Sequence, residues 1–186
     1  MIHQRKNFYI ITGCSGGGKS TIIEGLRAQG VRCVDEAGRE IVKEQLRSGG
    51  DGIPWQNVAK FRDLLLARYI ELFMNTVEPH RAVFFDRAIP EVVGASRGMR
   101  VPVPEGHLEA AATYIYARKV FVTPPWPEIF TTDAERRHSY ETALEDYEIL
   151  TKVYPEFGYQ LIEIPREAVS ERIKFILGRI DPGIQP

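Results

Sequence analysis

Apolar positions along the chain fall into two patterns that alternate from one end to the other. Five short segments are almost continuously apolar and rich in β-branched residues, which is typical of strands buried on both faces of a sheet. Between them lie longer segments with apolar residues three or four positions apart, as in amphipathic helices. The predicted strands are 8–12, 31–34, 82–85, 119–123 and 159–164, and the predicted helices are 21–29, 38–46, 58–75, 89–97, 105–118, one that includes 140–154, and 169–180.

This alternation predicts an α/β fold with a five-stranded, mostly parallel sheet between two layers of helices, formed by residues 1–186 as one domain. The prolines of residues 124–127 end the fourth strand, because Pro cannot continue a ladder. Thr132 or Asp133 is expected to cap the helix that includes residues 140–154, with Glu135 closing a capping box from Thr132. Residues 181–186 are expected to fray.

The connection between the first strand and the first helix has the composition of a phosphate-binding loop. It matches the pattern G-x-x-x-x-G-K-[ST] in the strand–loop–helix context that this loop requires. Its glycines let backbone N–H groups converge on a polyphosphate, and the helix adds its positive dipole end. The alternative is a glycine-rich turn with an accidental Lys-Ser pair. We predict a nucleoside triphosphate site formed by Gly13, Cys14, Ser15, Gly16, Gly17, Gly18, Lys19, Ser20 and Thr21.

Within this loop, two side chains have predicted roles in chemistry. Lys19 would reach the β- and γ-phosphates, and the Ser20 hydroxyl would ligate Mg²⁺. The positive surroundings of the loop could lower the pKa of Cys14, but we interpret this residue as a small filler.

Charged residues follow the second and third strands, where the carboxyl ends of parallel strands meet at one crevice. Asp86 follows four apolar residues, as a Walker-B carboxylate does, and would hold Mg²⁺ or act as a base; the alternative is a helix cap. Arg87 would contact the acceptor or the transferring phosphate, unless it pairs with Asp35 or Glu36. Glu36 or Asp35 could accept a proton from an attacking hydroxyl; the alternative is that both are solvated caps. Arg39 lies in the first turn of a helix, where a cation interacts unfavourably with the helix dipole. We therefore expect its side chain to point at an anionic ligand.

A polar segment between the fourth strand and the next helix is the candidate lid, about residues 124–140. Arg136 and Arg137 would neutralise charge on the phosphoryl group during transfer as the lid closes. The alternative is that both are solvated and balance the charges of Asp133 and Glu135. Arg166, after the last strand, could stack on the nucleobase or lie exposed. Trp55, Tyr69 and Trp126 are candidates for lining the acceptor pocket, although core packing explains the first two equally well.

Composition excludes several classes of function. A net charge of −1 over 186 residues gives no broad footprint for nucleic acid or anionic membrane. Two cysteines are too few for a disulfide framework or a cysteine-based zinc site, and no apolar run approaches 18 residues. The first seven residues are polar and too short for a signal peptide. We therefore expect a cytoplasmic protein, monomeric or homodimeric, with no membrane or nucleic-acid partner.

With these segments in view, the chain resembles the bacterial predicted P-loop ATPases of the AAA-domain type, related to the nicotinamide riboside kinase domain of a bacterial NAD regulator. The resemblance runs from about Phe8 to Ile180. It rests on residues 13–20, Asp35-Glu36-Ala37-Gly38-Arg39-Glu40, Phe85-Asp86-Arg87, Pro124-Pro125-Trp126-Pro127 and Thr131-Thr132-Asp133-Ala134-Glu135-Arg136-Arg137.

The resemblance implies a three-layer P-loop fold of the nucleoside or nucleotide kinase type, with strand order 2-3-1-4-5 and a helical lid over ATP. It also implies an analogy with deoxynucleoside kinases, in which an acid after the second strand is the base and an acid-Arg pair follows the third. Asp35-Glu36 and Asp86-Arg87 are similar in placement. Arg87 stands where a motor ATPase has its second Walker-B acid, which argues for a kinase-like site.

Two functions are therefore expected to compete. The first is an ATP- and Mg²⁺-dependent kinase that phosphorylates a small hydroxylated metabolite, nucleoside-like or sugar-like. The second is a nucleotide-dependent regulatory ATPase, or switch, that acts through a protein partner. Phosphorylation of nucleic-acid ends is a weaker third interpretation, because the net charge is near zero.

Overall fold

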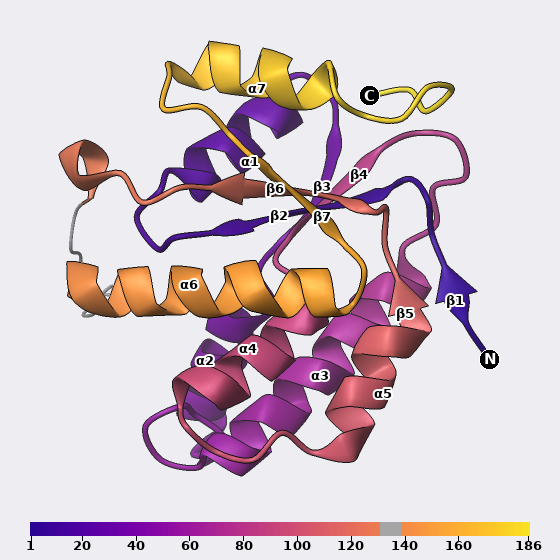
Figure 1. Cartoon of the computed structure of the whole chain (residues 1–186). Helices are drawn as coiled ribbons and strands as arrows, with labels where there is room; N and C mark the ends of the chain where they lie inside the picture. The colour runs from indigo at the N-terminus through magenta and orange to yellow at the C-terminus, as the bar shows by residue number, and fades with distance from the viewer. Residues whose placement is uncertain (131–138) are drawn as a thin grey trace.

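The computed structural model describes residues 1–130 and 139–186, which form a parallel sheet with helices on both faces (Figure 1). The strand order is β3-β4-β2-β6-β7, and every neighbouring pair runs parallel. The predicted sheet and the order implied by the resemblance are therefore confirmed. The strands are β2 Phe8–Gly13, β3 Arg32–Val34, β4 Val83–Asp86, β6 Lys119–Thr123 and β7 Gln160–Glu163.

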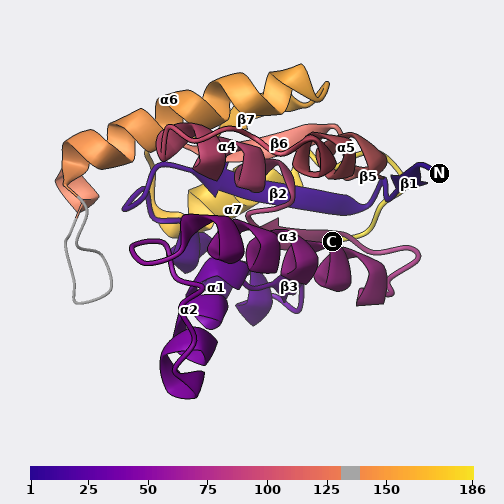
Figure 2. The same ribbon diagram turned by 90° about the horizontal axis from the view of Figure 1, so that it is seen from below.

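The helices divide unequally between the two faces of the sheet (Figure 1). One face is covered by α1 (Lys19–Ala28) and α7 (Val169–Leu177), which contact each other. Figure 2 shows α6, α4 and α3 in sequence across the other face, with α2 and α5 packed against them. These five helices are α2 Ala37–Ser48, α3 Val58–Asn75, α4 Pro90–Gly98, α5 Glu105–Thr113 and α6 Tyr140–Glu156.

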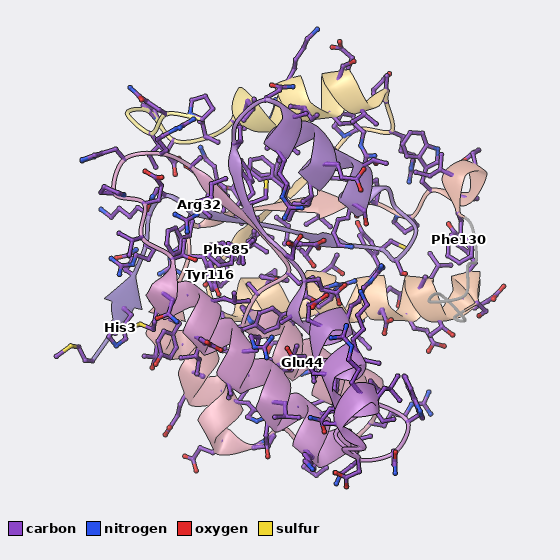
Figure 3. All side chains as sticks on the ribbon, turned by 180° about the vertical axis from the view of Figure 1, so that it is seen from behind. His3, Arg32, Glu44, Phe85, Tyr116 and Phe130 are labelled. Carbon is purple, nitrogen blue, oxygen red and sulfur yellow. The ribbon has the colours of Figure 1, made fainter. Side chains whose placement is uncertain are left out.

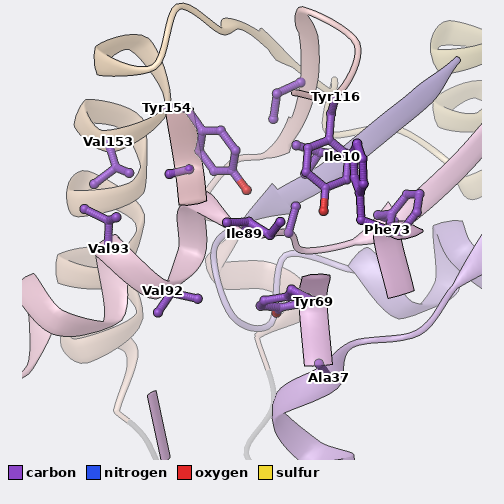
Figure 4. Close-up of a cluster of buried hydrophobic side chains, with 14 of the residues drawn as sticks. Ile10, Ala37, Tyr69, Phe73, Ile89, Val92, Val93, Tyr116, Val153 and Tyr154 are labelled. Atoms are coloured by element: carbon purple, nitrogen blue, oxygen red, sulfur yellow. The ribbon is translucent and has the colours of Figure 1, made fainter. Parts of the chain in front are cut away.

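The central strand shows why the sheet needs helices on both sides. Side chains alternate between the faces of a strand. In β2, Phe8 and Ile10 pack with α3, α4 and α6, whereas Tyr9 and Ile11 pack with α1 and α7. All four are at most 1% exposed. Figure 4 shows the larger of the two clusters, in which Ile10 lies among side chains of the helical layer.

The chain departs from the predictions near both ends. The predicted helix 105–118 is wrong after Thr113, because Tyr114–Ile115 forms β5, which pairs with β1 (His3–Gln4). The His3 ring stacks on the Tyr114 ring at 5.2 Å, so an aromatic contact replaces the last helical turn. The predicted fraying of residues 181–186 is also wrong: the Gln185 carbonyl accepts a hydrogen bond from the Ala82 N–H at 2.7 Å.

The segments on either side of residues 131–138 position the far end of the site. After β6, the proline-rich turn continues into a short 3₁₀ helix, η1 (Pro127–Ile129). Ser139 caps α6, accepting a hydrogen bond from the Thr142 N–H at 3.3 Å. The predicted caps, Thr132 and Asp133, lie outside the described residues, as does Glu135. No helix within residues 1–130 and 139–186 is long and apolar enough to cross a membrane.

Candidate active site

The glycine-rich loop connects β2 to α1 at the carboxyl edge of the sheet, in a backbone conformation that needs glycine. Gly13 has φ 122°, and a Cβ there would lie 2.3 Å from the Thr123 carbonyl oxygen, so the loop leaves the sheet in direct contact with β6. The Cys14 N–H donates to that same oxygen at 3.0 Å. Gly18 caps α1 with φ 77°. The first N–H groups of α1 therefore face the crevice without intrahelical partners.

Lys19 and Asp86 form an ion pair at the floor of the crevice, with 3.8 Å between the Nζ and Oδ1 atoms. Their side chains are only 11% and 13% exposed. Burial lowers the pKa of Lys19 and raises that of Asp86, and the mutual attraction opposes both shifts. The Asp86 Oδ1 atom is buried and accepts no hydrogen bond from the described residues. A carboxylate oxygen beside the loop that lacks a hydrogen-bond donor fits Mg²⁺, a hard cation with oxygen ligands, together with the Ser20 hydroxyl.

The two acids after β3 lie in different surroundings. The Asp35 side chain is 72% exposed and pairs with Arg27 at 2.5 Å, away from the other candidate residues. The Glu36 side chain is 26% exposed, and its carboxylate lies 3.9 Å from the Arg87 Nε atom and 3.2 Å from the Arg39 Nε atom. The structure therefore brings Glu36, Arg39 and Arg87 together and separates Asp35 from them.

Arg87 combines a strained backbone with a firmly held side chain. Its φ of 67° lies in the left-handed region, and its N–H donates to the Ile11 carbonyl at 3.0 Å. One guanidinium nitrogen donates to a Glu91 carboxylate oxygen at 2.7 Å. Burial alone would lower the pKa of Arg87, but Glu91, Glu36 and Asp86 together raise it well above its usual value. Because the backbone and the guanidinium are both tied, this cation is fixed at the edge of the crevice.

Glu91 is a site residue that the sequence analysis did not find. It lies in the first turn of α4 and is 6% exposed. Its carboxylate also accepts hydrogen bonds from the hydroxyls of Thr12, directly before the loop, and Tyr154, on α6, the second at 3.0 Å. Figure 4 shows the Tyr154 ring reaching from α6 into the interior. A buried carboxylate with three donors ties β2, the end of β4 and α6 to one point. Its place four residues after Arg87 in a predicted helix was the available signal.

Arg172 is the second residue that the sequence analysis missed. It lies on α7, is 1% exposed, and donates to the Gly17 carbonyl at 2.8 Å. Its guanidinium also lies 5.4 Å from the centre of the Trp126 ring. Trp126, predicted as a possible lining of the acceptor pocket, thus lies beside Arg172, which contacts the phosphate loop. Trp55 is 70% exposed and Tyr69 is buried in the core at 2%.

The remaining predicted residues surround the loop in less direct ways. Cys14 is buried, its Sγ atom lies 3.4 Å from the Ala143 carbonyl, and burial raises its pKa, as a filler residue requires. Thr21 is exposed, and its hydroxyl donates to the Gly18 carbonyl at 2.8 Å. Arg166 donates to the Pro125 carbonyl at 3.0 Å, which joins the loop after β7 to the proline-rich turn. Arg136 and Arg137 lie outside the described residues.

An aromatic side chain covers the open side of the loop. The Phe130 ring, labelled in Figure 3, packs edge-on against Tyr140, with ring centres 5.1 Å apart. A Cβ built on Gly16 would lie 2.5 Å from this ring. The phosphate loop thus has an aromatic neighbour after η1 and an arginine neighbour on α7.

Solved structures with this fold include small-molecule kinases. The chain is similar to deoxyadenosine kinase from M. mycoides (17% identity, TM-score 0.61, covering 92% of this chain and 97% of that one). It is also similar to shikimate kinase from Acinetobacter baumannii in complex with shikimate (17% identity, TM-score 0.55, covering 92% of this chain and 90% of that one). A third structure is NadR protein in complex with NR (15% identity, TM-score 0.65). The similarity covers 97% of this chain but only 52% of that one.

A search of curated proteins found no match. A family model described as "AAA domain" matches residues 8–172, from the start of β2 to Arg172 on α7. This match includes the phosphate loop, both acid-bearing strand ends and the proline-rich turn. The chain therefore belongs to this AAA domain family and has its P-loop kinase-type fold.

Proposed function

We propose that the protein is a kinase that transfers the γ-phosphoryl group of ATP, with Mg²⁺, to the hydroxyl of a small nucleoside-like or sugar-like metabolite. The observation that carries this proposal is the Lys19–Asp86 pair, in which the Asp86 Oδ1 atom has no hydrogen-bond donor among the described residues. Lys19 would contact the β- and γ-phosphates, and residues 13–21 would surround them with backbone N–H groups. Ser20 and Asp86 would hold Mg²⁺, which neutralises charge on the phosphates when bound.

The residues beyond Asp86 support an acceptor on that side. Glu36 would accept the proton of the attacking hydroxyl, since its carboxylate is partly exposed and faces Arg87. Arg87 and Arg39 would orient the acceptor or the transferred phosphoryl group, because guanidinium groups suit bidentate contact with oxygen anions. Asp35 would act only at the rim, as its exposed pairing with Arg27 suggests.

The other side of the loop supports the nucleotide. Arg166, held beside the proline-rich turn, would lie near the nucleobase. Arg136 and Arg137 would add positive charge over the phosphates when the lid closes. The similar structures that are named deoxyadenosine kinase and shikimate kinase make a small hydroxylated acceptor the preferred class over a protein or nucleic-acid end.

The test is transfer from γ-labelled ATP to pools of nucleosides, sugars and other hydroxylated metabolites, resolved by mass. The wild type should give a phosphorylated small molecule that requires Mg²⁺. Lys19→Ala should abolish nucleotide binding. Asp86→Asn should lower Mg²⁺-dependent turnover about 10²–10³-fold with the fold intact, because the metal loses a charged ligand. Asp35→Asn is the matched control and should leave turnover within about twofold, since Asp35 is exposed and lies apart.

Glu36→Gln separates a base from a merely structural acid. If Glu36 is the proton acceptor, Glu36→Gln should lower kcat and have little effect on nucleotide affinity. Release of free phosphate alone, with every acceptor pool tried, would count against transfer and favour the nucleotide-dependent switch. Capture of a protein partner only with a nonhydrolysable ATP analogue would then be the next measurement.

A further inference from the structure

The side chain of Arg172 is buried beside the phosphate loop, and no carboxylate of residues 1–130 or 139–186 pairs with it. It is the largest of the fully buried side chains. Its Nε atom makes no hydrogen bond with the described residues. Burial lowers the pKa of Arg172, and no acidic group in the described part of the chain offsets that shift. A guanidinium that is desolvated and unpaired is unfavourable for the protein alone, so a role in folding explains it poorly.

The contact with the loop has a direct consequence for one backbone N–H group. The peptide between Gly17 and Gly18 is planar and trans, so its carbonyl and its N–H point in opposite directions. Arg172 holds the Gly17 oxygen at 2.8 Å, and this contact fixes the Gly18 N–H on the side away from α7. A cation on the carbonyl also polarises the peptide and makes that N–H a stronger donor.

The fit between Arg172 and the loop is tight. A Cβ built on Gly18 would lie 2.6 Å from an Arg172 guanidinium nitrogen, so a side chain here would displace the guanidinium, and the positive φ itself favours glycine. The opposite contact, with the Trp126 ring, limits movement away from the loop. The guanidinium therefore has a fixed place between the loop and the proline-rich turn.

We propose that Arg172 is a positioning residue for the phosphate loop: it aims the Gly18 N–H at the polyphosphate and supplies a positive charge that no acid of the described residues neutralises and that the bound nucleotide would. This inference rests on the proposed nucleotide site and adds a residue of α7 to it. It implies that Arg172 stabilises the nucleotide-bound protein and not the free one. A structural role would instead stabilise the free protein.

The experiment compares Arg172→Met with wild type in two measurements. Calorimetry with Mg²⁺ and a nonhydrolysable ATP analogue should give a dissociation constant at least tenfold higher. The melting temperature without nucleotide should stay the same or rise, since an apolar side chain of similar length replaces an unpaired charge. Arg179→Met is the matched control: Arg179 follows α7, is exposed and stacks on Phe175, so the affinity should not change.

Four outcomes would overturn the proposal. A lower melting temperature with unchanged affinity in Arg172→Met would make the residue structural. If Arg172→Met does not fold, Arg172→Lys decides: it keeps the charge but loses the planar fork, so an affinity equal to wild type counts against positioning, and a several-fold loss supports it. A wild type that binds no nucleotide overturns the proposed function as well, whereas wild-type binding with unchanged Arg172→Met affinity overturns this inference alone.

Discussion

Two arginines flank the phosphate loop, Arg87 partly buried and Arg172 fully buried, and their surroundings are opposite in charge. Arg87, at the end of β4, lies 2.7 Å from Glu91 and 3.9 Å from Glu36. Arg172, on α7, contacts a backbone carbonyl and an indole ring, with no carboxylate beside it among the described residues. The side of the crevice proposed for the acceptor therefore has its positive charge compensated by the protein's own carboxylates. The nucleotide side keeps a positive excess that a polyphosphate can neutralise.

The same physics gives the two arginines different roles. An ion pair taken out of water contributes to stability only while both partners stay, because each charge alone is costly to bury. Removing Arg87 should therefore harm the free protein, whereas removing Arg172 should harm only the complex. A series of substitutions around Arg87 can test this difference, since its partners can be removed one contact at a time.

The largest expected effect on stability belongs to Arg87→Met. It leaves Glu91 buried, and Glu36 partly so, without their shared cation, which should cost about 3 kcal/mol of unfolding free energy. Transfer should also be lost, because the cation at the acceptor side is gone. Urea denaturation followed by circular dichroism measures the first effect.

Arg97 provides the control for this change, because it forms an equally close pair in water. Two of its nitrogens lie 2.6 and 2.7 Å from Glu156, but the side chains are 36% and 48% exposed. Arg97→Met should cost less than about 1 kcal/mol. Equal costs for Arg87→Met and Arg97→Met would contradict the contrast between a compensated interior charge and a surface pair.

A smaller effect is expected from Glu91→Gln. The amide oxygen can still accept from Thr12 and Tyr154, but its NH₂ group faces the Arg87 guanidinium, so one charged hydrogen bond is lost at about 1.5–3 kcal/mol. The KM for the acceptor should rise while nucleotide affinity stays constant, since Arg87 loses its orientation and the loop does not. Weaker nucleotide binding with an unchanged KM for the acceptor would contradict this prediction, because Glu91 would then support the nucleotide and not the acceptor.

The sheet, the helices that flank it and the phosphate loop could be predicted from the sequence, because they depend on the local hydrophobic period and on residues adjacent in the chain. Glu91 and Arg172 could not be predicted in this way. Their decisive contacts, with Thr12 and Gly17, join residues 79 and 155 positions apart. In sequence, a charged residue on an amphipathic helix looks solvated, and only the packing of α4 and α7 shows it buried.

Local rules also could not separate adjacent residues of one kind. Asp35 and Glu36 both follow a strand, and their division between Arg27 and Arg87 depends on how β3 twists into α2. The anchored C-terminal segment has the same explanation. The tail is held because the Ala82 N–H donates a hydrogen bond to the Gln185 carbonyl, a contact between distant residues that no local pattern predicts.

The smallest effect in the series is expected from Tyr154→Phe. This change removes one hydroxyl from Glu91, which keeps Thr12 and Arg87, so the loss at pH 8 should be about 1 kcal/mol. Tyr147→Phe is the control on the same helix. Its hydroxyl donates to Glu163 at 3.3 Å in exposed surroundings, and the change should stay within about 0.5 kcal/mol.

The pH dependence makes this last prediction specific to burial. Burial raises the pKa of Tyr154 well above its usual value, and the Glu91 charge raises it further, so the unfolded chain loses this proton first, near pH 10. Wild-type stability then falls by about 1.4 kcal/mol per pH unit on account of Tyr154, a loss that the Phe variant lacks. The gap between the two proteins should therefore close within about one pH unit above 10 and then reverse. A gap that stays constant or widens above pH 10 would mean that burial against Glu91 does not raise the pKa of Tyr154, and this side of the crevice would lose its link to α6.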